Sequence, residues 1–233
     1  MAIPVYLAMT AAEFSSCGEL PEHSAWMACH FSPYGTGLSN LPPALPESSL
    51  LILNDRTPIR WHDPREIADA LVETVERLHC SGVLLDLQRP GCEETAALAR
   101  VLVQMLPCPV CVSASYAEAL SCPVLVPPVP LLKTLQEHLV PWSGREVWLE
   151  LALDGATVTV TDTGSTSVPL PPFSQHHCPH EDVQLFCHYG LELDMKQAVF
   201  TLKRTKRDLQ NLQNAAENWG VTRLIGLWQE LGT

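Results

Sequence analysis

The residues in this sequence whose types and spacing best suit chemistry are Asp86 and Gln88, which close the apolar run Gly82–Leu85. Because successive side chains on a β-strand alternate between its two faces, residues two apart point to the same face. If the strand belongs to a parallel α/β barrel, its C-terminal end contributes to the active-site mouth. A carboxylate beside an amide at such a mouth indicates a site that binds or hydrolyses a sugar.

The run Ser81–Pro90 resembles the signature strand of glycoside hydrolase family 18, the chitinase-like barrels, which reads roughly D-G-[IV]-D-[IL]-D-[WFL]-E-[YR]-P. Ser81 and Leu84 replace the two earlier aspartates of that signature, and Gln88 stands where the family carries its catalytic glutamate. The residues that match include Gly82, Val83, Leu85, Asp86 and Pro90. The resemblance implies a barrel fold and a carbohydrate ligand.

The resemblance also implies roles for the two polar side chains. In this family a glutamic acid protonates the leaving oxygen, the substrate's acetamide attacks the anomeric carbon, and an aspartate at the position of Asp86 orients the acetamide. Gln88 has no proton to release near neutral pH, although its amide can still hydrogen-bond a glycosidic oxygen. We therefore expect a degenerate site that binds an N-acetylglucosamine-containing glycan, such as peptidoglycan, with little or no hydrolysis. A polar cluster without any ligand, in a non-enzymatic interaction scaffold, remains an alternative.

The C-terminal helix and final strand resemble the way the same family closes its barrel, with a strand of the type G-[IVL]-x-x-W-x-L-G; here Trp228 matches the tryptophan, and Gly226 lies nearby. The resemblance implies that Trp228 forms the floor of the sugar site, whereas tryptophan also serves as a core residue whose indole N–H finds a partner. The proportions of the chain, with an extra hairpin before the last helix, look most like the compact spore-associated branch of the family.

Two other carboxylates could act as a relocated acid in an active hydrolase. Glu150 shares a strand face with Trp148, and Glu230 shares a face with Trp228. An exposed or salt-bridged carboxylate is the alternative for each, because most acidic side chains are exposed. The remaining candidates for contact with the ligand are Asn54, Asp55, Tyr116 and Tyr189.

The His and Cys patterns do not predict a metal or redox site. His176–His180 holds three histidines and one cysteine without a spaced partner pair, so we interpret it as a polar loop. Cys108 and Cys111 have CxxC spacing but lead into a strand, whereas redox pairs open a helix. No phosphate-binding glycine motif is present, and we expect no cofactor.

Strand and helix patterns alternate along the chain, which favours a parallel sheet. We predict a single domain over residues 1–233, a compact (β/α)8 TIM-type barrel with irregular or missing elements near the N-terminus. Asp63-Pro64 should begin a helix, and Gly220 should end the helix that starts at Arg207. Asp154-Gly155 predicts a hairpin between strands 146–153 and 157–161, and residues 164–180 should form a loop.

The 233 residues carry a formal net charge of −12, with 46% hydrophobic and 17% charged residues. The acidic balance argues against nucleic acid and anionic membranes as partners. The basic run Lys203–Arg207 is short, and we expect a solvated helix start.

Nine cysteines, an odd number, fit buried thiols better than a disulfide framework. No signal peptide or membrane span is visible, so we expect a cytoplasmic protein, with a spore-associated location as the alternative.

Overall fold

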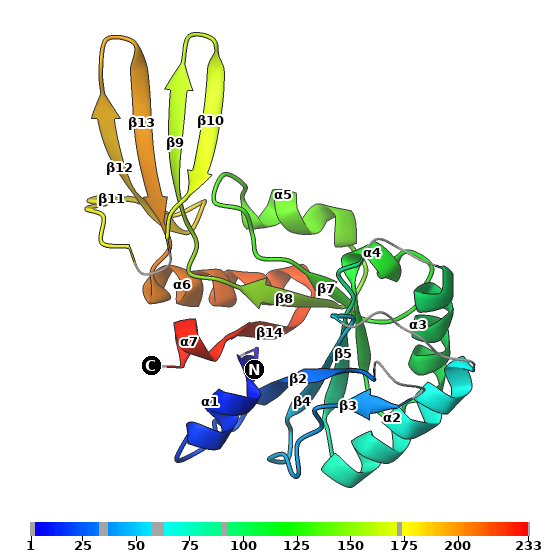
Figure 1. The fold of residues 1–233 in the computed structure, drawn as a ribbon. Coiled ribbons are helices and arrows are strands. Elements are labelled where there is room, and N and C mark those ends of the chain that lie inside the picture. The colour runs from blue at the N-terminus through cyan, green and yellow to red at the C-terminus, as the bar shows by residue number, and fades with distance from the viewer. Residues whose placement is uncertain (1–2, 33–36, 57–62, 90–92, 172–173, 233) are drawn as a thin grey trace.

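Eight parallel strands close into a barrel in the computed structural model, which describes residues 3–32, 37–56, 63–89, 93–171 and 174–232 (Figure 1). Pairing between β1 and β2 joins the two ends of the sheet and closes the circle. This confirms the predicted (β/α)8 TIM-type fold. The barrel strands are β1 (Val5–Met9), β2 (Ser24–Phe31), β4 (Leu50–Asn54), β5 (Gly82–Asp86), β6 (Val110–Ser113), β7 (Val124–Val126), β8 (Val147–Leu151) and β14 (Val221–Leu227).

Helices cover the outside of the barrel, and the longest begins where the sequence predicts. The Asp63 side chain accepts a hydrogen bond from the backbone N–H of Arg65, and Pro64 occupies the first helical turn. Gly220 ends the last turn before β14 with a positive φ of 76°. The helices are α1 (Ala11–Ser16), α2 (Pro64–Leu78), α3 (Glu93–Met105), α4 (Ala114–Ala117), α5 (Leu135–Leu139), α6 (Lys206–Ala216) and α7 (Trp228–Leu231), with short 3-10 turns at Val140–Trp142 and Glu217–Trp219.

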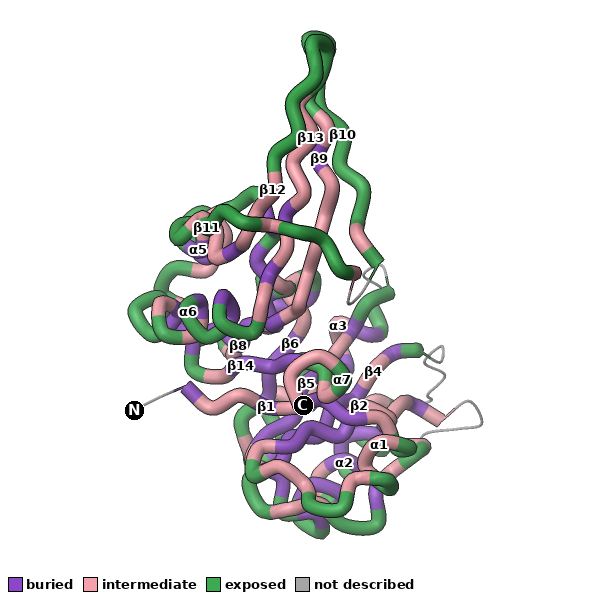
Figure 2. The backbone as a smooth tube through the Cα atoms, turned by 90° about the vertical axis from the view of Figure 1, so that its left-hand side faces the viewer, coloured by how far each residue is buried: buried purple, intermediate pink, exposed green. Residues whose placement is uncertain are grey.

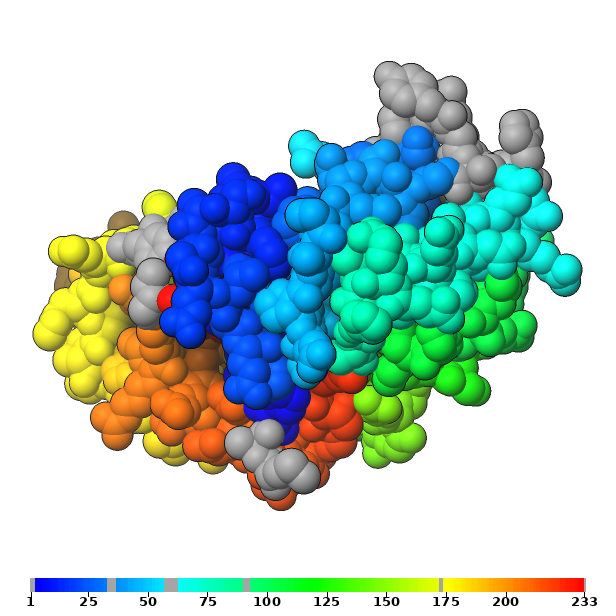
Figure 3. Space-filling view, turned by 90° about the horizontal axis from the view of Figure 1, so that it is seen from below, coloured from blue at the N-terminus to red at the C-terminus, as the bar shows by residue number. Residues whose placement is uncertain are grey.

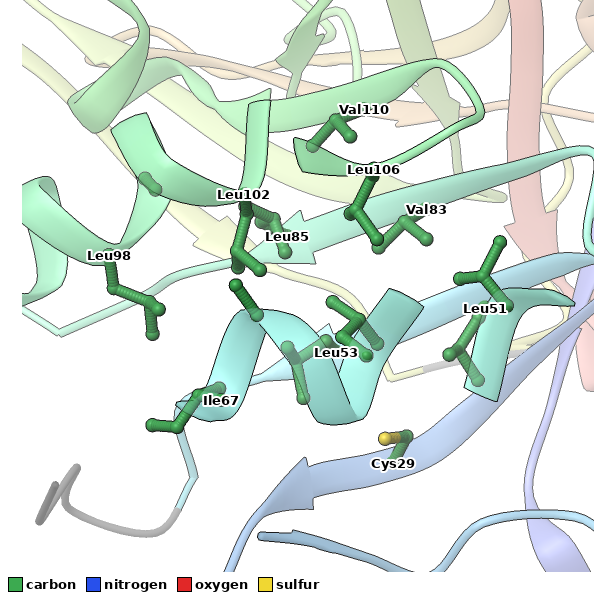
Figure 4. Close-up of a cluster of buried hydrophobic side chains, with 14 of the residues drawn as sticks. Cys29, Leu51, Leu53, Ile67, Val83, Leu85, Leu98, Leu102, Leu106 and Val110 are labelled. Atoms are coloured by element: carbon green, nitrogen blue, oxygen red, sulfur yellow. The ribbon is translucent and has the colours of Figure 1, made fainter. Parts of the chain in front are cut away.

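The largest hydrophobic cluster lies between the outer face of the barrel and helices α2 and α3 (Figure 4). Leu98 and Leu102 of α3 and Ile67 of α2 pack there against strand residues such as Leu53 and Leu85, all almost fully buried. Burial of each such side chain contributes about 1.5–3 kcal/mol. The packing fixes the direction of β4 and β5, and therefore of the polar residues at their C-terminal ends.

The N-terminal quarter is more regular than the sequence suggests, since β2 lies within residues 11–47 and completes the barrel. The only element between β2 and β4 in the described residues is a two-residue strand, β3 (Leu38–Ser39), antiparallel to β2. No barrel strand is missing near the N-terminus, and the described part of the β2–β4 connection holds a short strand instead of a helix. From below, the blue N-terminal residues lie against orange and red C-terminal residues, as the β1–β14 pairing requires (Figure 3).

A second, antiparallel sheet stands away from the barrel between β8 and α6, and we call it the β-lobe (Figures 1 and 2). The predicted hairpin at Asp154-Gly155 is wrong, because β8 stays in the barrel while the next strand pairs with β10 and β13. The predicted loop over 164–180 is also wrong in part, since it contains β10 and the first residue of β11. The lobe strands are β9 (Gly155–Thr161), β10 (Gly164–Pro169), β11 (His180–Asp182), β12 (Cys187–Leu193) and β13 (Gln197–Lys203).

Arg204 joins the β-lobe to the barrel. Its side chain is 1% exposed, so the expectation of a solvated basic run is wrong at this position. The guanidinium donates hydrogen bonds to four backbone carbonyls, and Asp154 lies 4.0 Å away. Because these donors satisfy one buried and three partly buried carbonyls at once, one charged side chain fixes the base of the lobe. The acceptors belong to Val129, Pro130, Leu185 and Phe186.

The described cysteines are free thiols, as predicted, and four of the eight are buried. Burial raises the pKa of Cys29 and of Cys80 to about 12, so both thiols stay protonated at neutral pH. Within the described ranges, no helix is long and apolar enough to span a bilayer.

Candidate active site at the barrel mouth

An open cavity at the C-terminal end of the barrel lies next to a layer of inward-facing side chains. Ile52, Leu84 and Trp148 belong to the hydrophobic cluster inside the barrel. Two residues further along the same strands stand Asn54, Asp86 and Glu150, which therefore face the same way. Asn54 and Asp86 are also paired directly across β4 and β5.

The cavity has a volume of about 760 Å³ and combines these polar groups with apolar walls. Its size falls in the range of small-molecule sites, which fix a ligand with a few polar groups over apolar surface. Six of the nine residues that the sequence singles out line it: Asn54, Asp55, Asp86, Gln88, Glu150 and Glu230.

The segment that carries Gln88 is held rigidly by its neighbours. The carboxylate of Asp55, which is 3% exposed, accepts the backbone N–H groups of Gln88 at 3.0 Å and Arg89 at 2.9 Å. Ser113 of β6 accepts the backbone N–H of Leu87 at 2.8 Å. These bonds fix the backbone at Gln88, and with it the point from which the side chain extends.

Gln88 and Asp86 form a hydrogen-bonded pair within the cavity. The Gln88 amide nitrogen lies 3.1 Å from each carboxylate oxygen of Asp86. Burial raises the pKa of Asp86, the hydrogen bond from Gln88 opposes this shift, and the nearby Asp55 charge raises the pKa further. The carboxylate offers acceptors to a ligand, and the amide offers a carbonyl acceptor and an N–H donor.

Glu150 contributes a second carboxyl from β8, which β6 and β7 separate from β5 in the barrel wall. Burial raises its pKa to about 7, and the charge of Asp86 adds to the shift. No ion pair to Glu150 or Asp86 occurs in the described part of the chain. Near neutral pH, Glu150 therefore carries a proton much of the time and can act as a donor.

Glu230 faces the cavity but is already engaged. One of its carboxylate oxygens accepts the backbone N–H of Leu153 at 2.7 Å, which ties α7 to the segment after β8. A carboxylate used in this way has fewer free lone pairs for a ligand than Glu150 has.

Three further candidates lie outside the cavity lining. Trp228 begins α7 and its ring packs against Gly232, where a Cβ would come within 2.2 Å of the ring. Tyr116 is buried and donates to the carbonyl of Arg89 at 3.1 Å. Tyr189 lies on the β-lobe beside a separate apolar hollow of about 500 Å³. Contact of these three residues with a ligand stays a prediction.

Arg56 and Arg89 also line the cavity, and the sequence reasoning did not select them. Arg89 donates through Nε to the carbonyl of Asp55 and through Nη2 to that of Arg56, each at 2.8 Å. The sequence signal that could have predicted Arg89 as a cavity residue is its position directly after Gln88. Pro90, which closes the signature run, lies outside the described residues.

The His176–His180 segment runs along the lobe into β11. Across the described ranges, no three His, Cys, Asp or Glu side chains are grouped so that they could hold a metal ion.

Comparison with known proteins places this fold. No family model matches the sequence, and no curated protein matches it. The spore cortex-lytic enzyme SleL of Bacillus cereus is similar in structure, with a TM-score of 0.62 and 9% identity over 96% of this chain and 70% of that one. A chitinase from Chromobacterium violaceum has a TM-score of 0.60 and 8% identity over 99% of this chain and 95% of that one.

A third similar structure is a family 18 chitinase from Cycas revoluta, with a TM-score of 0.59 and 10% identity over 96% of this chain and 94% of that one. That structure is of a variant with a glutamate-to-glutamine and a glycine-to-tryptophan substitution, in complex with (GlcNAc)4. The chain therefore has the barrel fold of the family 18 chitinases and of spore-cortex glycosidases.

Proposed function

We propose that the cavity binds an N-acetylglucosamine-containing glycan without efficient hydrolysis. The observation that carries the proposal is the Asp86–Gln88 pair, which lies in an open cavity at the barrel mouth. Asp86 offers a carboxylate to an acetamide N–H, and Gln88 offers an amide to a glycosidic oxygen. Because an amide cannot act as an acid, the expected loss of rate is about 10²–10⁴-fold.

The similar structures support this choice of ligand. The Cycas revoluta chitinase variant is bound to (GlcNAc)4, so in that protein a glutamate-to-glutamine change is compatible with binding an N-acetylglucosamine oligomer. The likeness to SleL is the ground for including spore peptidoglycan among the candidate glycans, and with it a spore-associated location.

A paired measurement tests the proposal. The wild-type protein is incubated with (GlcNAc)4 and, separately, with muropeptide-linked glycan strands. Mass spectrometry follows the products, and calorimetry follows binding. We expect binding of at least one of the two glycans and no detectable cleavage. Lack of binding to both by a folded protein would overturn the proposal, and the interaction-scaffold alternative would then stand.

A second candidate function, hydrolysis with a relocated acid, is favoured by the position of Glu150. It lines the same cavity as Asp86 from another part of the barrel wall and holds a proton near neutral pH. In such a reaction Glu150 would protonate the glycosidic oxygen as the C1–O bond breaks. Water would add to C1 and give its proton to Asp86, which returns it to Glu150 after product release.

Leaving-group chemistry distinguishes this second function from the first. Dinitrophenyl glycosides need little protonation, whereas natural oligosaccharides need a full proton transfer. If Glu150 is the acid, Glu150→Gln abolishes cleavage of (GlcNAc)4 but spares the dinitrophenyl glycoside of the same sugar. Glu230→Gln, whose carboxylate is engaged by Leu153, serves as the control and keeps both activities. Equal loss on both substrates in Glu150→Gln would exclude Glu150 as the acid.

A further inference from the structure

Strand β10 forms an unprotected edge of the β-lobe. It stands at the end of the sheet order and pairs with β9, in an unbroken register from Gly164 to Pro169. All six of its residues are exposed, as the green colour of β10 in Figure 2 shows. Proteins usually protect such edges with charges, bulges or covering segments.

The direction of each backbone group along β10 follows from the register. The N–H of Leu170, the next residue after the strand, donates to the carbonyl of Gly155 on β9 at 2.9 Å. Backbone groups alternate along an antiparallel strand, so even-numbered residues face β9. Ser165 and Ser167 therefore turn their N–H and C=O groups outward, where no strand of the described sheet receives them.

Charge does not protect this edge. The hairpin 155–169 contains one charged residue, Asp162, which lies in the turn between β9 and β10. The whole chain carries a net charge of −12, so most of its surface repels a second copy of itself. The outer edge of the lobe is a place where this repulsion is locally absent.

The sequence of β10, Gly-Ser-Thr-Ser-Val-Pro, is nearly self-complementary about Thr166. In an antiparallel pair centred on Thr166, Ser165 lies opposite Ser167 of the second copy, and Ser167 lies opposite Ser165 of the second copy. All the outward N–H and C=O groups of these serines then find partners. The two Thr166 residues face each other as a close, non-hydrogen-bonded pair, a favourable cross-strand combination.

We propose that two copies of this chain associate through β10, joining their lobes into one continuous antiparallel sheet. Pro169, which has no N–H, lies outside the four paired serines and does not interfere. Ser165 also lines the apolar hollow of the lobe, so pairing would bring the two hollows next to each other across the two-fold axis. An edge of this length alone is smaller than a standard interface, and the dimer should therefore be weak and concentration-dependent.

Sedimentation velocity over a micromolar-to-millimolar range tests the proposal on the whole chain. We expect a monomer–dimer equilibrium in the wild-type protein and at least a tenfold weaker one in Ser167→Pro, which removes an outward N–H. Ser167→Ala keeps that N–H and should dimerise as the wild type does. Ser165→Lys, which adds a charge without touching the β9 ladder, should also weaken the dimer and serves if the proline variant does not fold.

Amide hydrogen exchange locates the interface. In the dimer, the amides of Ser165 and Ser167 should become protected, whereas Thr166 and Val168 should be protected at all concentrations. A wild-type chain that stays monomeric at millimolar concentration would overturn the proposal. So would a dimer that Ser165→Lys and folded Ser167→Pro leave unchanged, or one in which the two serine amides exchange freely.

Discussion

The amide nitrogen of Gln88 donates to both carboxylate oxygens of Asp86, at 3.1 Å in each case. This bond opposes the rise in the pKa of Asp86 that burial and the Asp55 charge cause. It also holds the Gln88 side chain where a ligand entering the cavity would meet it. A glutamic acid at position 88 would place its proton where the Gln88 amide now meets an entering ligand.

Gln88→Glu should therefore introduce hydrolysis. The new carboxyl lies beside Asp86, and the like charge raises the pKa of one of the two groups, which favours an acid that holds its proton. We expect turnover of (GlcNAc)4 to rise about 10²-fold or more above background, the value of a positioned acid. Gln88→Met, which removes the hydrogen bond without adding an acid, is the matched control. Equal inactivity of both variants would show that position 88 does not reach the scissile bond.

Glu150 should make stability depend on pH. Its pKa is about 7 in the folded chain and near the ordinary 4.5 when unfolded, so between these values the native state binds more protons. The free energy of unfolding should therefore fall as pH rises from about 4.5 to about 7, by roughly 3 kcal/mol at most. Urea titrations at several pH values measure this slope.

In Glu150→Gln the slope should become shallower, and what remains includes the contribution of Asp86, whose pKa is also raised by burial. A variant with an unchanged slope would show that Glu150 ionises normally in the folded protein.

Arg204 should be among the most costly side chains to remove. Arg204→Met leaves the buried carbonyl of Val129 and three partly buried carbonyls without this donor, at about 1–3 kcal/mol for a fully buried unsatisfied group and less for the others. We expect a loss of about 3 kcal/mol or more in the free energy of unfolding, with faster amide exchange in β12 and β13. Arg207→Ala, at an exposed position of the same run, should change stability by less than about 0.5 kcal/mol. If Arg204→Met and Arg207→Ala both changed the free energy of unfolding only slightly, Arg204 would not be the residue that fixes the base of the lobe.

The sequence predicts the barrel and its polar mouth because strand ends in a parallel barrel meet at one place. Asp86 and Gln88 follow an apolar run whose inner face continues into the cavity, and Glu150 follows Trp148 in the same way. Which side chains face the cavity depends on the alternation of inward- and outward-facing residues along a strand, and the sequence of one strand is enough to show this alternation. The helix start at Asp63-Pro64 is equally local.

The β-lobe escaped prediction for reasons that are not local. Asp154-Gly155 has the composition of a hairpin turn, but β8 already has two parallel neighbours in the barrel, so β9 must find partners elsewhere. Strand β10 is rich in Ser and Thr because it is exposed, and its composition is that of a loop. Burial of Arg204, rather than of another member of its basic run, depends on carbonyls about 75 residues earlier in the chain.

Titration calorimetry with (GlcNAc)4 and with cellotetraose, on the wild type and Asp86→Ala, tests the central claim most directly. The two ligands differ in the acetamide groups that Asp86 is proposed to hold. We predict that the wild type binds (GlcNAc)4 more tightly, and that Asp86→Ala weakens this binding by about 1.5–3 kcal/mol, the value of a hydrogen bond to a charged group, while changing cellotetraose little. Equal affinity of the wild type for both oligomers, or a loss in Asp86→Ala that is the same for both, would contradict recognition of an N-acetylated glycan by this site.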